Sequence, residues 1–217
     1  MSALLPEIFP DWTGKTCAVV AGGSSAEHLA SVLRGRCKII VVNLAFRLIP
    51  DADILYAADS GFWLHYRDAH KFQGLKLSAD RVATQHCSAA FHVDIPKVQG
   101  RRVQDFIREP VGRIGDGGGN GGAQAVNLAV QTNASTILLA GLDYQGPHWH
   151  PDHGRGLRNP SPQQFLRWRK CLDAQAFRLR EWGVRVINLS NKSTLRAYPH
   201  DEADRYLSDQ VDSALST

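Results

Sequence analysis

The stretch GGGNGGAQAVNLAVQTNASTILLAGLDYQGPHWHPDHG, from Gly117 to Gly154, carries most of the information about the fold. A glycine cluster opens a segment rich in small residues, which predicts a helix over residues 121–134. The apolar run over 135–141 predicts a buried strand. A helix that leads directly into a buried strand is typical of proteins in which helices pack on a parallel sheet. The stretch therefore predicts an α/β fold, in which an acid and three histidines follow the strand.

The rest of the chain repeats this alternation. Apolar runs over residues 17–22, 38–43, 52–60 and 184–190 each predict a strand that is buried on both faces. Segments able to form helices or turns separate them. We therefore expect a Rossmann-like fold, with an open, mostly parallel sheet and helices on both faces.

Two helices are predicted in the C-terminal third of the chain. Ser161 begins the first, because it is a capping residue with a proline next to it and a glutamine three residues on. Gly183 ends this helix, and a shorter helix is predicted over 201–215. One face of the long helix is apolar and is expected to be structural; its residues are Phe165, Trp168, Leu172, Leu179 and Trp182. Arg167, Arg169 and Lys170 are expected nearer solvent.

The middle of the chain, over about residues 76–115, is less regular. Runs at 81–86 and 89–94 have the composition of strands, and the remainder reads as a basic, loop-rich insertion. Repeats, low-complexity tracts and a linker are absent from the sequence. We therefore expect one domain over residues 1–217, with an irregular insertion in its middle.

Composition narrows the class of protein. The four cysteines form no CxxC pair, so we expect free thiols, buried at Cys17 and Cys171. Apolar stretches fall short of the roughly 20 residues that cross a membrane, and the N-terminus does not read as a leader, so a cytoplasmic protein is expected. The net charge of +4 suits anionic small molecules and gives little support to a nucleic-acid partner.

Polar and small residues close three of the predicted strands. Gly22, Gly23 and Ser24 follow the first, and we expect Ser24 or Ser25 to cap the next helix. Glycines permit close approach of the backbone, and a helix N-terminus offers N–H groups to a phosphate. The other strand-end residues are Asn43, Asp59 and Ser60. Ligands bind at the carboxyl ends of strands in open α/β sheets, although each residue alone also suits a cap or a turn.

The segment after the strand at 135–141 holds a second group of candidates. Asp143 could bind a metal, a ribose hydroxyl or an acceptor. The spacing of His148, His150 and His153 leaves three alternatives open. These are a zinc site, one histidine that acts as a general base or phosphate partner, and a solvated loop.

The order of these motifs resembles that of the MptE-like family. The matching stretches are AVVAGGSS at 18–25, VVNLAF at 41–46, DILYAADS at 53–60 and GGNGGAQAVNLAVQTNASTILLAGLDYQG at 118–146, followed by an H-x-H-x-D-H-G loop. The family includes archaeal 6-hydroxymethylpterin pyrophosphokinases and the central domain of motility accessory factor glycosyltransferases. More distantly, the chain resembles bacterial sialyltransferases that use CMP-sugars. The resemblance spans about residues 15–195.

The resemblance implies a set of site residues. It places a nucleotide beside Gly22, Gly23, Ser24, Asn43, Asp59, Ser60, Gly118, Asn120, Gly121 and Ser190. It also implies that Asp143 and one of His148, His150 and His153 are catalytic. The first turn departs from the family pattern, because Gly-Gly-Ser stands where the family has Gly-x-Gly-Pro-Ser.

The implied function is group transfer from a nucleotide-activated donor. The leading expectation is a glycosyltransferase of the sialyltransferase or accessory-factor type, acting on a small-molecule, glycan or protein acceptor. The first alternative is a pyrophosphokinase that uses ATP with Mg²⁺. The second is a nucleotide-binding or interaction protein that kept the fold without the chemistry. No resident cofactor or metal is implied, apart from Mg²⁺ with a nucleotide.

Overall fold

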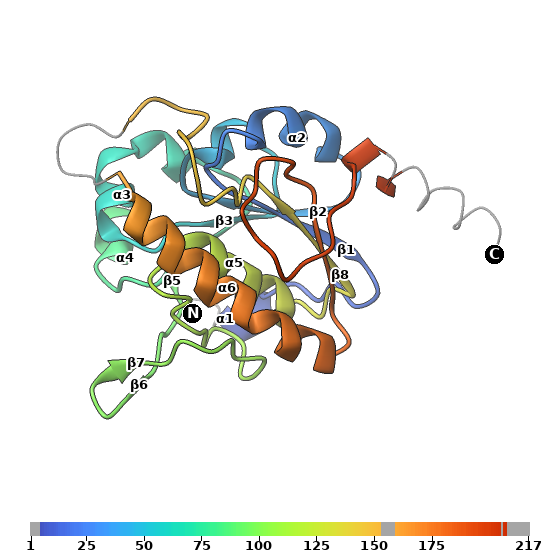
Figure 1. Ribbon diagram of the computed structural model, residues 1–217. Helices are drawn as coiled ribbons and strands as arrows, with labels where there is room; N and C mark the ends of the chain where they lie inside the picture. The colour runs from blue at the N-terminus through green and yellow to red at the C-terminus, as the bar shows by residue number, and fades with distance from the viewer. Residues whose placement is uncertain (1–4, 153–158, 205, 208–217) are drawn as a thin grey trace.

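The computed structural model describes residues 5–152, 159–204 and 206–207, and a parallel sheet forms its centre (Figure 1). Seven strands of the described chain form this sheet, in the order β5-β4-β3-β2-β1-β8-β9. They are β1 (Thr16–Val20), β2 (Lys38–Val42), β3 (Ile54–Tyr56), β4 (Leu75–Ser78), β5 (Ala90–His92), β8 (Thr136–Ala140) and β9 (Arg185–Asn188). All their pairings are parallel, so the predicted Rossmann-like α/β fold is confirmed.

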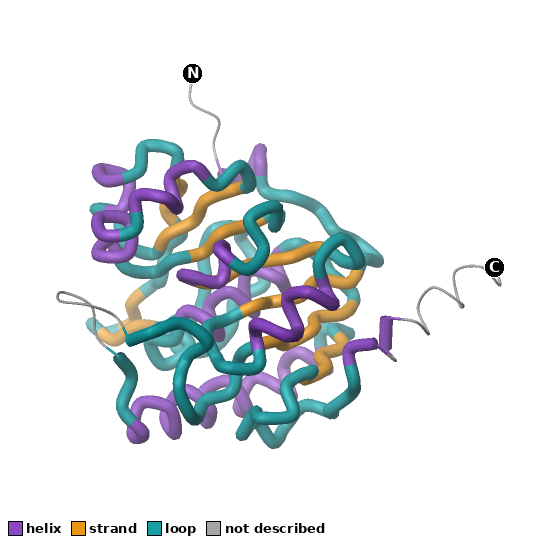
Figure 2. The backbone as a smooth tube through the Cα atoms, turned by 90° about the horizontal axis from the view of Figure 1, so that it is seen from above, coloured by secondary structure: helices purple, strands orange, loops and turns teal. Residues whose placement is uncertain are grey.

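Helices cover both faces of the sheet (Figures 1 and 2). They are α1 (Leu5–Ile8), α2 (Ala26–Leu33), α3 (Ser60–His65), α4 (Ala83–His86), α5 (Gly121–Gln131) and α6 (Pro162–Glu181), with 3₁₀ helices η1 (Asn43–Arg47) and η2 (Arg67–Lys71). Alternate strand residues point to opposite faces. Val19 therefore packs in one core with α5 and α6, whereas Val20 packs in the other with α2 and α3.

The strand order reverses at the centre of the sheet. From β1 the chain moves outward through β2, β3 and β4 to β5, and then returns to place β8 on the other side of β1. The connections from β1 and β8 therefore leave in opposite directions and open a crevice beyond their carboxyl ends. In open α/β sheets this switch point is where ligands bind.

The long helix α6 begins and ends as predicted. The Ser161 hydroxyl accepts a hydrogen bond from Gln164 N, and the Gln164 side chain accepts one from Ser161 N. Gly183 follows the helix with a φ of 72°. Leu172 and Leu179 are buried as expected.

Other predictions about α6 hold only in part. Trp168 is half-buried rather than buried, because it packs beside a cavity at the N-terminal end of the helix. Arg167 and Lys170 are exposed as expected, but the side chain of Arg169 is only 17% exposed, beside Asp173.

The middle of the chain is more regular than predicted. Residues 81–86 were expected to suit a strand, but they form a turn and helix α4, since Asp80 accepts a hydrogen bond from Val82 N and starts the turn. The run at 89–94 contains β5, as predicted. The irregular region therefore begins at residue 93 and contributes no strand to the seven-stranded sheet. It carries a separate hairpin of β6 (Lys97–Val98) and β7 (Arg101–Arg102).

Some boundaries and cysteine environments differ from prediction. The strand predicted over 52–60 spans only β3, because Ser60 already begins α3. Most of the helix predicted over 201–215 lies outside the described residues. All four cysteines are free; Cys17 is buried as predicted, and Cys171 is half-buried. In the described chain, no helix combines the length and apolar character needed to cross a membrane.

Candidate functional site

A cavity of about 150 Å³ lies at the carboxyl ends of β1, β2 and β8, at the switch point of the sheet. Eight of the predicted site residues line it: Gly22, Gly23, Asn43, Asn120, Gly121, Asp143, His148 and His150. Five others lie outside its lining: Ser24, Asp59, Ser60, Gly118 and Ser190. His153 falls outside the described residues.

The first glycine turn, Gly22–Ser24, follows β1 and packs tightly against the end of β8. Gly23 N donates a hydrogen bond of 2.8 Å to Gly141 O. A Cβ atom on Gly23 would lie 2.5 Å from the carboxyl carbon of Asp143, closer than real contacts allow. Only glycine therefore fits at position 23, because the backbone must approach a buried carboxylate.

Asp143 is the centre of a buried hydrogen-bond cluster. Its carboxylate is 2% exposed and accepts bonds of 2.6 Å from the hydroxyls of Ser25 and Ser190, and one of 3.0 Å from Ser25 N. Ser25 is the N-cap residue of α2, as one of the two predicted alternatives, but its hydroxyl binds this acid and makes no side-chain cap. Ser190 is 1% exposed and serves the same cluster. Three protein donors occupy the carboxylate, and this geometry favours a positioning role for Asp143 and Ser190.

The strand-end residues of β2 and β3 divide between the cavity and its surroundings. Asn43 lies at the end of β2, is exposed, and has a left-handed backbone with a φ of 51°. Asp59 and Ser60 lie one strand further out, where Ser60 N donates to the Asp80 carboxylate at 3.3 Å. Desolvation raises the pKa of Asp59, and the neighbouring Asp80 raises it further, although the side chain reaches solvent. Asp59 and Ser60 are therefore neighbours of the cavity and do not form its wall.

The second glycine turn, Gly117–Gly119, leads into helix α5. Its three residues have φ values of 56°, 75° and 79°, which side chains other than glycine rarely adopt. Asn120 then caps the helix through its side-chain oxygen, which accepts a bond of 2.9 Å from Ala123 N. Gly121 and Gly122 line the cavity, and the N–H group of neither donates a hydrogen bond to another described residue. A helix N-terminus of this kind favours an anion.

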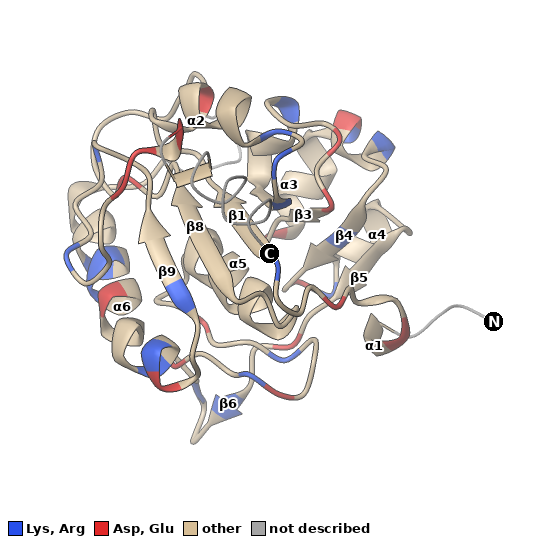
Figure 3. Cartoon of the chain, turned by 90° about the vertical axis from the view of Figure 1, so that its right-hand side faces the viewer, with Lys and Arg blue, Asp and Glu red and all other residues tan. Residues whose placement is uncertain are grey.

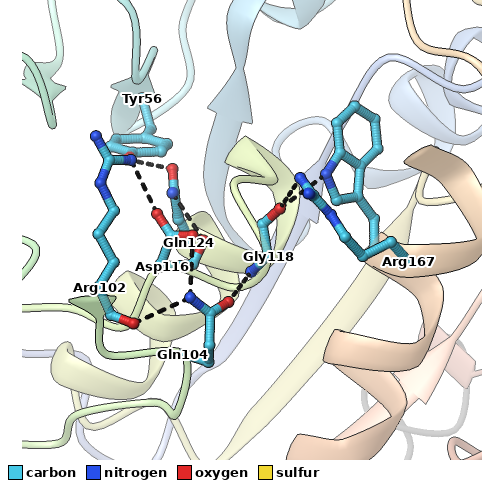
Figure 4. Close-up of polar contacts among 8 residues, drawn as sticks. Tyr56, Arg102, Gln104, Asp116, Gly118, Gln124 and Arg167 are labelled. Carbon is cyan, nitrogen blue, oxygen red and sulfur yellow. Dashed lines mark hydrogen bonds and ion pairs between the residues drawn. The ribbon is translucent and has the colours of Figure 1, made fainter. Parts of the chain in front are cut away.

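Side chains of the surrounding elements hold the second turn by hydrogen bonds (Figure 4). Gly118 O accepts bonds from Arg167 Nη2 at 2.6 Å and Trp168 Nε1 at 3.1 Å. Gly118 N donates to Gln104 Oε1 at 2.8 Å. Both polar atoms of Gly118 are therefore used within the protein, which places this residue in the framework of the site.

A second layer of bonds supports Gln104 and the start of the turn (Figure 4). Asp116 accepts hydrogen bonds from Arg102 Nη1 at 3.0 Å and Gln104 Nε2 at 3.4 Å. Gln124 Nε2 donates to Asp116 O at 2.9 Å, and the buried Tyr56 hydroxyl donates to Gln124 Oε1 at 2.7 Å. The basic, loop-rich region thus supplies Arg102 and Gln104 to support the turn.

His148 and His150 are the two histidines of the loop that the structure describes, and they cover the first turn. Their ring centroids lie 4.9 Å apart, and Trp149 N between them donates to Gly22 O at 3.2 Å. His150 Nδ1 lies 2.8 Å from Pro151 O. Since a carbonyl only accepts, Nδ1 carries the hydrogen, and Nε2 is the basic nitrogen of the neutral ring. A Cβ atom on Gly22 would lie 3.8 Å from this Nε2 atom, so the basic nitrogen faces the first turn.

Aromatic residues complete the cavity, and the sequence analysis missed this role. Phe165 and Trp168 line it from α6, with their rings edge to face at a centroid distance of 6.0 Å. Their helical spacing predicted a structural face, and nothing in that spacing marks the end of α6 that faces a cavity. Tyr144, Gln145 and Pro160 also line the cavity.

The described residues contain no group of three histidine, cysteine or acidic side chains that could hold a metal ion. The zinc alternative required His153 together with His148 and His150. Because His153 lies outside the described residues, this alternative stays a prediction.

No protein-family model matches this chain, and no curated protein matches it. Among solved structures, its fold is similar to the sialyltransferase CstII from Campylobacter jejuni, determined in complex with a substrate analogue, CMP-3FNeuAc. The TM-score is 0.53 and the identity 11%, over 86% of this chain and 85% of that one. The similarity therefore concerns the fold, while the resemblance to the MptE-like family rests on the sequence motifs alone.

Proposed function

We propose that this chain is a transferase that binds a nucleotide-activated donor in the cavity, and that it is a sialyltransferase-like glycosyltransferase. The cavity carries the proposal, because it joins a helix N-terminus, whose N–H groups have no partner among the described residues, to two imidazoles at the switch point. The fold similarity to a sialyltransferase bound to a CMP-linked analogue supports the choice of donor.

In this proposal the donor phosphate lies at the N-terminus of α5. The N–H groups of Gly121 and Gly122 stabilise the negative charge that grows on the phosphate as it leaves. Phe165 and Trp168 offer an aromatic wall for the planar base or the apolar face of a sugar. The positively charged N-terminus of the helix and the aromatic wall suit the two halves of a nucleotide.

The acceptor hydroxyl is activated by a histidine above the first turn. Its oxygen attacks the anomeric carbon of the donor sugar, and the bond between that carbon and the phosphate oxygen breaks. The proton of the hydroxyl passes to the basic nitrogen of His148 or His150, and the nucleotide leaves with the bonding electrons. Asp143 takes no part in the proton transfer in this scheme, because Ser25 and Ser190 occupy its carboxylate.

The two alternatives use the same cavity differently. A pyrophosphokinase binds ATP with Mg²⁺, and a non-catalytic protein binds a nucleotide or partner without turnover. Calorimetric titration with CMP, CDP, UDP, GDP and ATP, each with and without Mg²⁺, separates the two enzymes by their ligands, and release of CMP from a CMP-sugar separates the glycosyltransferase from a protein that only binds. Binding of CMP without a need for Mg²⁺ is the expected result. Preference for Mg-ATP would favour the pyrophosphokinase, and a lack of binding to every nucleotide would overturn the proposal.

A matched pair of variants on α6 ties the binding to this cavity. Phe165→Ala removes part of the aromatic wall and should weaken CMP binding about tenfold. Phe177→Ala is the control, because Phe177 is 64% exposed and lies three turns further along the same helix. Equal affinities of the two variants would place the nucleotide elsewhere.

A further inference from the structure

The cavity lacks a basic partner for a phosphate in its immediate lining. Among the described residues that line it, none is lysine or arginine. Among the described residues, one basic side chain contacts each glycine turn directly. Lys192 contacts Ser24 in the first turn, and Arg167 contacts Gly118 in the second. These are the candidates for neutralising a bound phosphate.

Arg167 is committed to the framework. Its Nη2 atom donates a hydrogen bond of 2.6 Å to Gly118 O, and Trp168 Nε1 donates to the same oxygen (Figure 4). A carbonyl that receives two donors at a tight turn anchors both side chains. Loss of Arg167 would therefore disturb the turn itself.

The Lys192 side chain is held much more loosely. Its Nζ atom donates one long hydrogen bond, 3.3 Å, to the hydroxyl of Ser24, and the side chain is exposed. An ammonium group has three donors, so two hydrogens remain available beside the first glycine turn. A phosphate oxygen would replace the weak contact with Ser24 by a charge-assisted bond.

The backbone of Lys192, by contrast, is fixed. Its N–H donates to the Ser190 hydroxyl at 3.3 Å, and its carbonyl accepts a bond of 2.5 Å from Gln145, which lines the cavity. Thr194 N also donates to Asp143 O at 2.9 Å. The turn after β9 is thus pinned to the segment after β8.

Asp143 links this turn to the first glycine turn. One oxygen of its carboxylate accepts hydrogen bonds from both Ser25 and Ser190. The buried acid therefore fixes the position of the lysine-bearing turn relative to Gly22–Ser24. This relation gives Asp143 a function that does not require it to touch a ligand.

We propose that Lys192, held beside the first glycine turn, shares one phosphate subsite with the N-terminus of α5, so that its ammonium group neutralises the phosphate of a nucleotide bound in the cavity. The proposal rests on the proposed function, since it assumes that the cavity takes a nucleotide. The ligand class is a phosphate ester, and a nucleoside without phosphate gains nothing from Lys192.

Two ligands that differ only by the phosphate test this subsite. CMP and cytidine are titrated against the wild type, Lys192→Met and Lys192→Arg, and binding is followed by ligand-observed NMR. Lys192→Met should weaken CMP binding by about 10- to 100-fold and leave cytidine binding within about twofold. Lys192→Arg keeps the charge and should restore most of the CMP affinity. Lys15→Met is the matched control, because Lys15 is exposed and directly precedes β1, at the amino ends of the strands and away from the cavity at their carboxyl ends.

The outcomes separate the subsite from the proposed function. If the wild type binds CMP but Lys192→Met weakens CMP and cytidine equally, or weakens neither, the subsite is overturned and the proposed function stands. If the wild type binds neither CMP nor cytidine, the proposed function fails and the subsite fails with it. A loss confined to CMP, absent in Lys15→Met, supports the subsite.

Discussion

The two glycine turns support one cavity but need glycine for different reasons. In the first turn, Gly23 has an ordinary backbone, and it is a neighbouring carboxylate that leaves no room for a Cβ atom. In the second, Gly118 has a φ of 75°, so the backbone conformation itself disfavours a side chain. Packing against Asp143 therefore requires glycine in the first turn, whereas the backbone conformation requires glycine in the second.

The supports of the two turns differ in the same way. The first depends on one buried acid, Asp143, which binds Ser25 and Ser190. The second depends on a layered network that includes Gln104, Asp116 and Arg167 (Figure 4). A single substitution should therefore disrupt the first turn more than the second. Figure 3 shows Lys and Arg positions along α6 and on β6.

The largest expected effect is catalytic and tests whether the chemistry belongs to the first turn. Alanine replaces His148, His150 and His153 one at a time. The variant that lacks the general base should lose turnover by about 10²- to 10⁴-fold, with CMP affinity nearly unchanged. Release of CMP from a CMP-sugar measures turnover, and His28→Ala, exposed on α2, is the control. Full activity in all three variants would remove the histidine loop from the mechanism.

The next effect is on stability and tests the dependence of the first turn on one acid. Asp143→Ala should lower the free energy of unfolding by about 3–5 kcal/mol, because Ser25 and Ser190 lose a buried, charged acceptor. Urea denaturation measures it. Ser190→Ala removes only one of the three donors and should cost less. A change below about 1 kcal/mol for Asp143→Ala would show that the carboxylate is free to serve a ligand.

A smaller effect is expected from Gly118→Ala in the second turn. The left-handed backbone costs about 1–2 kcal/mol, and contact of the new Cβ with Cys171 Sγ at 2.8 Å adds to this cost. Gly35→Ala separates the cost of the backbone conformation from the cost of the steric contact, since Gly35 has the same φ of 75° and nothing within 4 Å of its Cβ position. If both variants lose the same stability, the packing of α6 against the second turn contributes nothing.

The sequence predicted the sheet well because its central strands are buried on both faces. Continuous apolar runs such as 38–42 have few alternatives, and the cap at Ser161 depends only on local residues. The short strand β4 and helix α4 were missed. Tertiary pairing, rather than periodicity, decides the structure of such short segments.

The site was predicted only as a location. Strand ends brought Gly22, Asn43 and Asp143 to one sheet edge, as the topology requires. The sequence could not distinguish an acid that faces a ligand from one that is buried, because Ser190 is 47 residues away from Asp143. The positions of Lys192 and Phe165 likewise depend on tertiary packing.

The smallest expected effect concerns the charges near the second turn. Desolvation and the nearby Asp80 raise the pKa of Asp59, whereas Arg102, which supports that turn, lowers it. A raised pKa means that the folded state holds the proton more tightly than the unfolded state does. Stability from this source is present below the unfolded pKa, near 3.8, and is lost as the pH rises through the folded pKa. At pH 7 the ionised Asp59 therefore opposes folding.

Asp59→Asn should consequently raise the free energy of unfolding at pH 7, by less than about 1 kcal/mol because the side chain reaches solvent. Thermal unfolding from pH 7 to pH 4 should show this gain shrinking as the wild-type carboxyl takes up its proton. Asp80→Asn is expected to lower the free energy of unfolding at pH 7 instead of raising it. Burial opposes ionisation of Asp80, but hydrogen bonds from Ser60 and Val82 outweigh it and lower its pKa, so its charge supports the fold at pH 7. A loss of stability in Asp59→Asn at pH 7 would mean that Arg102 dominates, and that the network of the second turn extends to the end of β3.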